Sequence, residues 1–374
     1  MHSKYKEVLL IGYYGRNNTG DDAMLFSLLS LLKDNSTIKQ YTVPANIQIS
    51  VPEELLNQVK VIPRRPLSIL AEIIQTDAIL IGGGTIFHDY SKKIRYIWAS
   101  FRYLILITWA RFLKKPVYLV GIGFGPFTTT SGRLIALLIS RLVNYITVRD
   151  VESYKYLQTL HVPTSKYNLT FDLSGYMAEI NLQEKVQSNI LGVSIIPYFY
   201  GYSNNPRKDI DLAYAIAKSL NKWLVKDPLC EIHFLTFLGI AEGDGDIKII
   251  QRVYQLIEEK NRVKIIDYSS DPRILLSHFN KCRAIVTMRY HAAVFAYLTK
   301  RPMIVLNYHP KCQSFVNDIG LTNHAVLSIQ DILEGKLIDS LNSLVSSPDL
   351  HLAKLPLSEA RRLVNFALPP LLRG

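Results

Sequence analysis

The sequence predicts an α/β protein built from two Rossmann-like domains that face a cleft. Short β-branched runs alternate with longer helical stretches along the 374 residues, and this alternation is typical of parallel sheets covered by helices on both faces. The length suits two domains of about 150–200 residues each. A polar, turn-rich stretch at residues 165–189 separates two runs of the pattern. We therefore place the boundary near Ile180, between domains at residues 1–180 and 181–374.

The first domain is expected to begin with a strand at residues 7–11, a loop rich in glycine and asparagine, and a helix from about residue 21 to residue 32. Further strands are expected at residues 78–81, 116–120 and 145–148. Each of them ends in glycines or in charged residues. Ligands of such sheets bind beyond the carboxyl ends of the strands, so the loops at these ends are the candidate binding elements.

The second domain repeats this pattern with a second parallel sheet. Buried strands are expected at residues 190–196, 231–237, 263–266, 284–287 and 303–306. Helical stretches separate them, for example residues 209–225 and 245–259, and the chain is expected to be helical from about residue 340 onward.

The formal net charge of +12 concerns the partners of the chain and not its fold. Lys and Arg are scattered, with no basic tail and no nucleic-acid motif. The charge therefore indicates an anionic membrane surface or a negatively charged small substrate, and not nucleic acid. The three cysteines, Cys230, Cys282 and Cys312, are widely separated, without the spacing of disulfide frameworks or zinc sites. No metal is expected.

The N-terminal segment predicts a strand and not a signal peptide, and the isolated cysteines are consistent with a reducing compartment. We therefore expect a cytoplasmic protein. The apolar stretch Ile97–Ala110 is too short to span a bilayer and contains Arg102. It predicts a buried amphipathic helix, with a helix lying on the membrane as the alternative. The net charge, together with Ile97–Ala110 and Leu363–Leu372, also predicts peripheral contact with the anionic inner face of a membrane.

Two loops of the first domain are rich in small residues. The loop Gly12–Asp22 is neither a Walker loop nor a dinucleotide fingerprint. Either its backbone N–H groups bind a ligand at the helix start, or it is a tight turn in which Thr19 or Asp21 caps the helix. The second loop, Gly82–Gly84, allows a ligand to approach the backbone closely. Asp89 lies just beyond it, either as a capping or surface carboxylate or as a group that orients or deprotonates a sugar hydroxyl.

A third loop, Gly121–Pro126, excludes NAD because its proline falls inside the spacing that a dinucleotide site needs. Arg149 ends the next strand. Its fork of donors suits a carboxylate or phosphate, although a pair with Asp150 at the helix start is an equal alternative.

The sharpest signal lies in the second domain, where a buried strand runs directly into a helix that begins near Arg289 and His291. A permanent cation and a titratable proton donor at a helix N-terminus indicate anion binding. Lys311 follows the next strand, either as a second phosphate contact or as a solvated lysine.

Together these loops resemble the polysaccharide pyruvyl transferase family. The matching segments follow the family's order over most of the chain: Gly12–Asp22, Gly82–Asp89, Gly121–Pro126, Val148–Asp150 and Met288–Ala296. The family's usual Arg-Leu-His triplet reads Arg-Tyr-His at residues 289–291, and Asn17 stands where a glycine is common. Either departure could alter the choice of acceptor. The resemblance implies a two-domain fold like that of the type-B glycosyltransferases.

The resemblance also implies a reaction, in which pyruvate from phosphoenolpyruvate forms a ketal with two hydroxyls of a glycan sugar and phosphate is released. No cofactor is implied, and the glycan is free or lipid-linked. His291 would be the acid, and Asp89 would orient or deprotonate the acceptor. The donor would be bound by Arg289, Lys311 and Tyr290 of the second domain together with Arg149. The first domain would bind the acceptor through Asn18, Asp21, Gly83 and Gly84.

Two other functions remain open on the sequence. A type-B glycosyltransferase that uses a nucleotide sugar would share the fold, and fold alone does not decide chemistry. A non-catalytic protein that binds a glycan or phosphate would bind the donor and release no phosphate.

Overall fold

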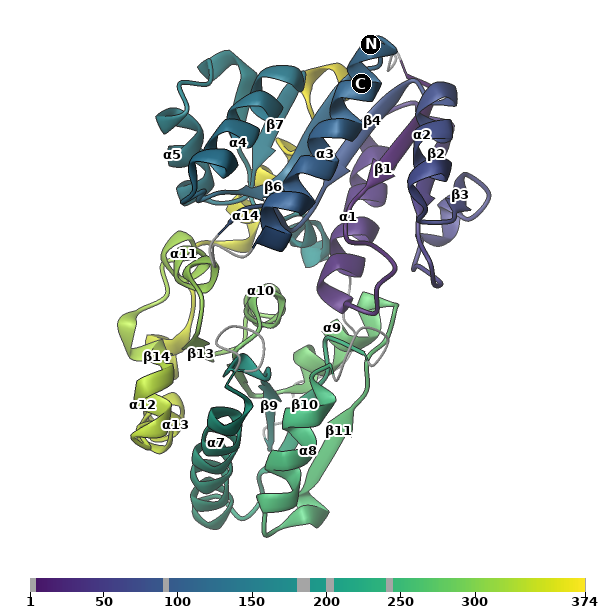
Figure 1. Ribbon diagram of the computed structural model, residues 1–374. Helices are drawn as coiled ribbons and strands as arrows, with labels where there is room; N and C mark the ends of the chain where they lie inside the picture. The colour runs from purple at the N-terminus through teal and green to yellow at the C-terminus, as the bar shows by residue number, and fades with distance from the viewer. Residues whose placement is uncertain (1–4, 90–93, 180–188, 200–204, 240–244, 374) are drawn as a thin grey trace. The chain divides into compact units, whose positions relative to one another are not determined.

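The computed structural model describes residues 5–89, 94–179, 189–199, 205–239 and 245–373. The chain forms two compact units, each with a parallel sheet and helices, as the sequence predicts (Figure 1). The first unit contains Met1–Arg16, Asp21–Met177 and Leu357–Gly374, and the second contains Asn17–Gly20 and Ala178–Pro356. The boundary expected near Ile180 lies outside the described residues.

The sheet of the first unit has eight strands in the order β3-β2-β1-β4-β6-β7-β8, with β5 beside β6. The strands are β1 (Glu7–Ile11), β2 (Gln40–Pro44), β3 (Val59–Ile62), β4 (Ala78–Gly82), β5 (Thr85–Phe87), β6 (Val117–Phe124), β7 (Tyr145–Val148) and β8 (Tyr167–Leu169). The central strands β4 and β6 are buried along their whole length, which explains why they read as continuous apolar runs.

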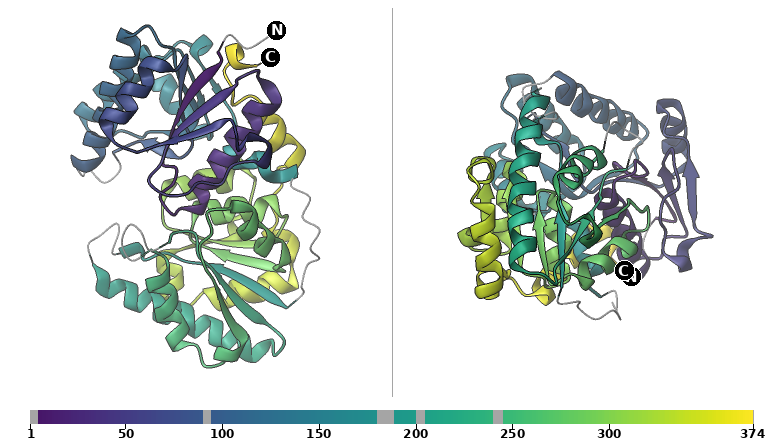
Figure 2. Two further views of the ribbon diagram at one scale, coloured as in Figure 1. Left: turned by 90° about the vertical axis from the view of Figure 1, so that its right-hand side faces the viewer. Right: turned by 90° about the horizontal axis from the view of Figure 1, so that it is seen from below.

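Helices cover both faces of this sheet. They are α1 (Thr19–Asn35), α2 (Pro66–Gln75), α3 (Ile94–Phe112), α4 (Thr130–Leu142), α5 (Val151–Thr159) and α14 (Leu357–Asn365). Helix α3 packs against both α2 and α4 on one face, and α1 and α14 lie on the opposite face (Figure 2, left).

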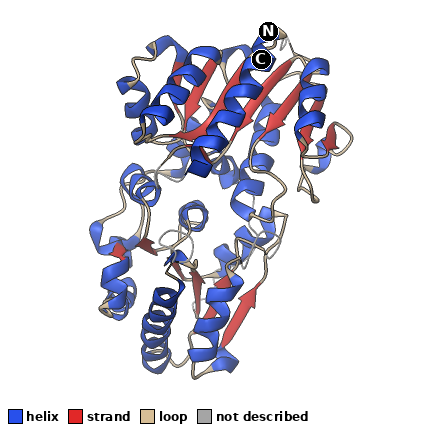
Figure 3. Cartoon of the chain, in the orientation of Figure 1, coloured by secondary structure: helices blue, strands red, loops and turns tan. Residues whose placement is uncertain are grey.

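The sheet of the second unit has six strands in the order β11-β10-β9-β12-β13-β14. They are β9 (Ile190–Ser194), β10 (Glu231–Leu235), β11 (Val263–Ile266), β12 (Ala284–Thr287), β13 (Met303–Asn307) and β14 (Val326–Ser328). The helices are α7 (Pro206–Lys226), α8 (Ile247–Leu256), α9 (Pro272–Lys281), α10 (Tyr290–Leu298), α11 (Pro310–Asp318), α12 (Ile329–Leu333) and α13 (Leu337–Ser346). Figure 3 shows the strands of each sheet as one layer among these helices. Because all pairs are parallel, the carboxyl ends of neighbouring strands share one edge.

The C-terminal segment departs from the division into residues 1–180 and 181–374, because Leu357–Gly374 belongs to the first unit. Leu368 and Leu372 are completely buried there, and Thr147 Oγ1 donates a hydrogen bond of 2.8 Å to the carbonyl of Ala367. The return of the chain depends on packing between segments far apart in sequence, which no local pattern reports. The segment Leu363–Leu372 therefore contributes to the core of the first unit, with Val364, Leu368 and Leu372 completely buried, and not to the predicted membrane contact.

The apolar stretch Ile97–Ala110 falls within α3. Its inner side is buried as expected, with Ile107 and Ala110 completely inaccessible. Within the described residues, no helix combines the length and apolarity needed to cross a membrane.

We predict that Leu368→Ala lowers the free energy of unfolding of the first unit by about 2–5 kcal/mol, because it leaves a cavity in a buried core. Leu371, three residues later, is 61% exposed, and Leu371→Ala is the control, with an expected change within about 0.5 kcal/mol. Urea unfolding in a Trp223→Phe background measures this, since the two remaining tryptophans, Trp98 and Trp109, lie in the first unit. Equal effects of the two alanines would contradict the assignment.

Candidate functional site

The carboxyl edge of the second sheet carries the predicted Arg-Tyr-His triplet. Strand β12 ends at Thr287, Arg289 is the N-cap residue of α10, and His291 lies in the first turn of that helix. Among the residues that the structure describes, no side chain makes a capping hydrogen bond to this helix. The first backbone N–H groups of α10 have no intrahelical acceptor, and a helix N-terminus favours negative charge. The local geometry is therefore that of an anion site.

Arg289 is held by a carboxylate that the sequence did not identify. Its Nε donates to Asp246 Oδ2 at 2.6 Å, and its Nη2 contacts Asp246 Oδ1. Asp246 is completely buried, and its Oδ2 also accepts from the backbone N–H groups of Phe237 and Leu238 at 3.1 and 3.0 Å. The pair therefore joins the start of α10 to the loop after β10. The guanidinium is fixed by this bidentate contact and is 19% exposed.

His291 packs directly on Gly20. A Cβ atom at Gly20 would overlap the ring atoms Nδ1 and Cγ of His291 and would lie 2.8 Å from its Cβ. Only glycine leaves room for the imidazole in this position. Gly20 lies within the loop Gly12–Asp22, and no local pattern in the sequence indicates its role, because the steric demand comes from a histidine far along the chain.

The short segment Asn17–Gly20 is anchored in the second unit. The N–H of Thr19 donates to the carbonyl of Phe237 at 3.0 Å, and Thr19 Oγ1 donates to the carbonyl of Ser269 at 3.2 Å. Asn18 Oδ1 accepts from the N–H of Gly20 at 3.1 Å. Because α1 begins at Thr19, this is a helix-capping contact made by Asn18 and not by Thr19 or Asp21, the two residues that the sequence predicted as caps. Asn17 has a φ of 54°, a left-handed conformation that glycine and asparagine tolerate best. The glycine common at this position in the family is thereby explained.

Buried polar atoms lie at the carboxyl ends of three strands in the second sheet, β10, β9 and β13, with β12 between the last two. Ser194 ends β9, Thr236 follows β10 and Asn307 ends β13. Within the part of the chain that the structure describes, Ser194 Oγ, Thr236 Oγ1 and Asn307 Oδ1 have no hydrogen-bond partner. Ser194 and Thr236 are 0% and 3% exposed. Buried polar atoms are nearly always hydrogen-bonded, so this edge is suited to a polar ligand. The sequence offered no signal for them beyond their place after a strand.

Tyr290 and Lys311 differ in their surroundings. The Tyr290 ring is buried and packs against Phe315 of α11, with ring centroids 5.3 Å apart. Lys311 lies in the first turn of α11, and its ammonium is 5.8 Å from the centre of the Tyr308 ring. It is partly exposed, so it can serve a ligand at this edge.

The carboxyl edge of the first sheet brings together Asp21, Gly83, Gly84 and Arg149. A Cβ at Gly84 would lie 3.3 Å from Asp21 Oδ1, and both glycines have positive φ. The N–H of Gly84 points at Met24 Sδ at 3.1 Å, and Arg149 Nη1 lies 4.0 Å from the same sulfur. The glycine turn is thus packed against the start of α1.

Arg149 is engaged inside the first unit. Its side chain is 2% exposed, and its Nη1 donates to Asp172 Oδ2 at 2.8 Å. Its Nη2 donates to Thr85 Oγ1 at 2.9 Å. The proposed pair with Asp150 is a longer contact of 3.9 Å. These contacts favour a structural role in shaping the glycine turn.

Asp89 is buried and binds the turn before α4. Its carboxylate accepts from the N–H and hydroxyl groups of Thr128 and Thr129, with 2.6 Å to Thr129 Oγ1 and 2.9 Å to the Thr129 N–H. Burial alone would raise the pKa of Asp89, but these hydrogen bonds outweigh it and hold the pKa below the ordinary value. A weakly basic carboxylate with four donors on it suits positioning of this turn better than proton abstraction.

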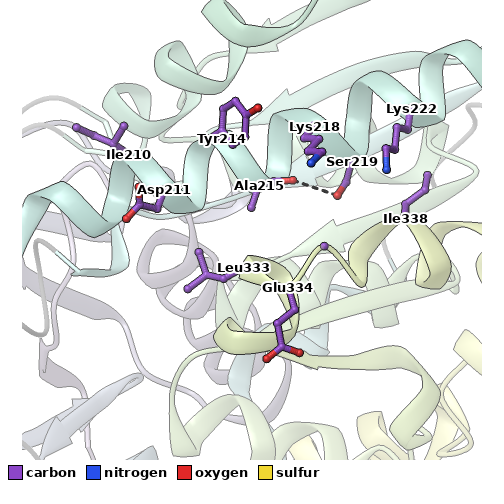
Figure 4. Close-up of a pocket in the computed structure, with 11 residues that line it drawn as sticks. Ile210, Asp211, Tyr214, Ala215, Lys218, Ser219, Lys222, Leu333, Glu334 and Ile338 are labelled. Atoms are coloured by element: carbon purple, nitrogen blue, oxygen red, sulfur yellow. Dashed lines mark hydrogen bonds between the residues drawn. The ribbon is translucent and has the colours of Figure 1, made fainter.

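A surface groove of about 730 Å³ lies elsewhere in the second unit, between α7 and the α12–α13 turn (Figure 4). Its lining includes Tyr214, Lys218, Lys222 and Glu334, and none of the predicted site residues. Among the described residues, no cluster of three or more His, Cys, Asp or Glu side chains could hold a metal.

The match to a family model identifies the chain. The model of the polysaccharide pyruvyl transferases matches residues 18–310, a range that includes the loop at Asn18, the glycine turn and the Arg-Tyr-His triplet. The chain belongs to the polysaccharide pyruvyl transferase family. It is also 21% identical over 291 residues to the amylovoran biosynthesis protein AmsJ of Erwinia amylovora, over 73% of this chain. The match spans 66% of AmsJ, slightly less than two thirds of its length.

Solved structures with low sequence identity share the fold of this pyruvyl transferase family member. The UDP-GlcNAc 2-epimerase of Neisseria meningitidis, bound to UDP-GlcNAc, is 14% identical with a TM-score of 0.62, over 96% of this chain and 97% of the epimerase. The Anabaena protein HepE, in complex with UDP-glucose, is 14% identical with a TM-score of 0.54, over 97% and 94% of the two chains. The predicted type-B glycosyltransferase-like fold is confirmed.

We predict that Asp89→Asn lowers the free energy of unfolding by about 1.5–3 kcal/mol at pH 7, because it removes charge-assisted hydrogen bonds. The lowered pKa of Asp89 stabilises the fold above the unfolded-state pKa of about 4, and this contribution is lost as pH falls through the folded-state value. The difference between variant and wild type should therefore shrink below about pH 4. Urea unfolding at several pH values measures it, with Asp349→Asn at an exposed position as the control. A pH-independent difference would contradict the assignment.

Proposed function

We propose that this chain transfers pyruvate from phosphoenolpyruvate to two hydroxyls of a glycan sugar, forming a ketal and releasing phosphate. The observation that carries the proposal is the Arg289–His291 triplet at the N-terminus of α10, in a chain that belongs to the pyruvyl transferase family. The relative AmsJ, whose name assigns it to amylovoran biosynthesis, supports a polysaccharide as the acceptor class.

The carboxyl edge of the second sheet suits the donor. Phosphoenolpyruvate carries a phosphate and a carboxylate. The backbone N–H groups at the start of α10, the fixed Arg289 guanidinium and the Lys311 ammonium are the complementary groups. The buried hydroxyls of Ser194 and Thr236 are further hydrogen-bonding groups for it.

The proposed chemistry begins with proton transfer. His291 donates a proton to C3 of the enol, which becomes a methyl group, and C2 becomes electrophilic. A sugar hydroxyl adds to C2 and gives up its proton, the C2–O bond to phosphate breaks, and the second hydroxyl adds to C2 with loss of its proton. One phosphoenolpyruvate and one diol thus yield one ketal and one phosphate.

The carboxyl edge of the first sheet suits the acceptor. Asp21 lies beside the glycine turn at Gly84, and carboxylates are usual partners of sugar hydroxyls. Arg149 and Asp89, whose contacts are internal to the first unit, shape this edge and its neighbouring turn. Asn18 contributes indirectly, because it accepts a hydrogen bond from the N–H of Gly20, and the His291 ring packs on Gly20.

The test is phosphate release from purified protein incubated with phosphoenolpyruvate and a panel of glycosides, free and lipid-linked. Phosphate release that requires a glycoside, with a ketal product, supports the proposal. Protection from thermal unfolding by UDP-glucose and not by phosphoenolpyruvate would favour a nucleotide-sugar transferase. Protection by phosphoenolpyruvate without turnover on any glycoside would favour a binding protein.

We predict that His291→Asn lowers kcat for phosphate release by about 10²–10⁴-fold, because an amide has no proton to donate near neutral pH. The KM for phosphoenolpyruvate should change little, since a neutral hydrogen-bonding group remains. His324→Asn, at an exposed position, is the control and should match wild type. Unchanged kcat with a raised KM would assign the proton to another group, such as Tyr290 or Lys311.

We predict that Gly20→Ala lowers kcat by about 10²-fold, because its methyl group displaces the His291 ring and misplaced catalytic groups lose rates of this order. Asn17→Gly is the matched control in the same loop, since glycine accepts the left-handed φ of that position. A thermal melt of each variant separates a site defect from unfolding. A folded Gly20→Ala variant with wild-type kcat would show that the His291 position is not needed for turnover.

A further inference from the structure

Helix α3 presents an apolar stripe to solvent. Trp98, Phe101, Ile105, Trp109 and Phe112 follow one another at intervals of three and four residues, which places them on one side of the helix. All five side chains are exposed, with Trp98 at 55%, Ile105 at 51% and Phe112 at 76%. We call these five residues the α3 stripe.

The α3 stripe is additional to the face with which the helix packs. Ile107 and Ala110 on the other side are completely buried in the core of the first unit. The exposed rings contact each other, with Trp98 and Phe101 centroids 5.7 Å apart and Trp109 and Phe112 centroids 5.8 Å apart. A helix that only covered a sheet would carry polar residues on this side.

Neighbouring helices on the same face of the sheet extend the apolar surface. Helix α4, which packs against α3, exposes Leu134 at 56% and Leu138. Helix α2 exposes Leu67 and Ile74. Exposed apolar side chains thus occur on three helices of one face, and large exposed apolar surfaces mark interaction sites.

The charge around the α3 stripe has one sign. Between Asp89 and Asp150 the sequence contains ten Lys or Arg residues and no Asp or Glu. This stretch therefore accounts for much of the chain's formal net charge of +12. The exposed basic residues on and beside α3 and α4 are Arg102, Arg111, Lys114, Arg133 and Arg141. The apolar surface is therefore bordered by cations alone along this part of the chain.

We propose that the α3 stripe and its basic border dock the protein on an anionic phospholipid bilayer. Trp and Phe are the side chains preferred at the level of the lipid headgroups, and Lys and Arg bind the headgroup phosphates. A second copy of the chain fits this surface poorly, because a two-fold interface would bring the same cations together. Docking places α3 in the plane of the interface, which agrees with the finding that no described helix can cross a membrane.

The test is flotation of the full chain with vesicles of phosphatidylcholine alone or mixed with phosphatidylglycerol. We expect the protein to float with the mixed vesicles, and salt to weaken the binding. Trp98→Ser/Ile105→Ser/Phe112→Ser should lower the partition coefficient at least tenfold. Arg102→Glu/Lys114→Glu should lower it by about thirty-fold or more, from about 1 kcal/mol for each cation at the surface.

Matched controls come from exposed positions of the second unit. Tyr214→Ser/Val225→Ser/Leu229→Ser removes three exposed apolar side chains there, and Lys218→Glu/Lys222→Glu reverses two exposed lysines. Both controls should bind like wild type, and the melting temperature of each variant checks its fold.

Three results with vesicles would overturn the proposal. They are a wild type that stays unbound with anionic vesicles, binding that does not depend on lipid charge, and α3-stripe variants that bind as tightly as the controls. Sedimentation without lipid tests the alternative that a second copy of the chain binds the α3 stripe. Self-association that the triple serine variant abolishes would support this alternative and would also overturn the proposal. All four results are independent of pyruvyl transfer, which the phosphate-release assay measures separately.

Discussion

The ion pair between Arg289 and Asp246 is the constraint on which the second unit's edge depends. Asp246 is completely buried, and a buried charge is tolerated only when it is paired and hydrogen-bonded. Arg289 and the two backbone N–H groups after β10 supply those partners. The first turn of α10 is therefore fixed relative to the loop that also receives Thr19, and this fixes where the His291 ring meets Gly20.

The same arrangement recurs in the first unit. Asp172 is buried and receives Arg149 together with the N–H and hydroxyl of Ser174, while Asp89 receives four donors from Thr128 and Thr129. In each case a carboxylate with occupied lone pairs fixes a loop at the carboxyl edge of a sheet. Charged residues near a candidate site thus divide into those that hold its loops and those that remain available to a ligand.

The sequence predicts much of this molecule because the information is local. Strand–helix alternation, glycines after strands and an Arg-Tyr-His triplet at a helix start are all visible in short windows. The sequence does not reveal the partner of Arg289, because Asp246 lies 43 residues away. Gly20 was missed for the same reason, since its steric demand comes from His291. The alternatives left open for Arg149 and Asp89 likewise depended on partners that only folding brings together.

The return of Leu357–Gly374 to the first unit has a consequence for synthesis. The ribosome delivers the chain from the N-terminus, yet the core that begins with β1 includes Val364, Leu368 and Leu372. The core of the first unit therefore remains incomplete until the second unit has been translated. The second unit, whose sheet lies within one continuous stretch, has all its strands available earlier. The first unit is thus the first to be translated and the last to complete its core. During this interval its apolar surface is exposed and can bind chaperones.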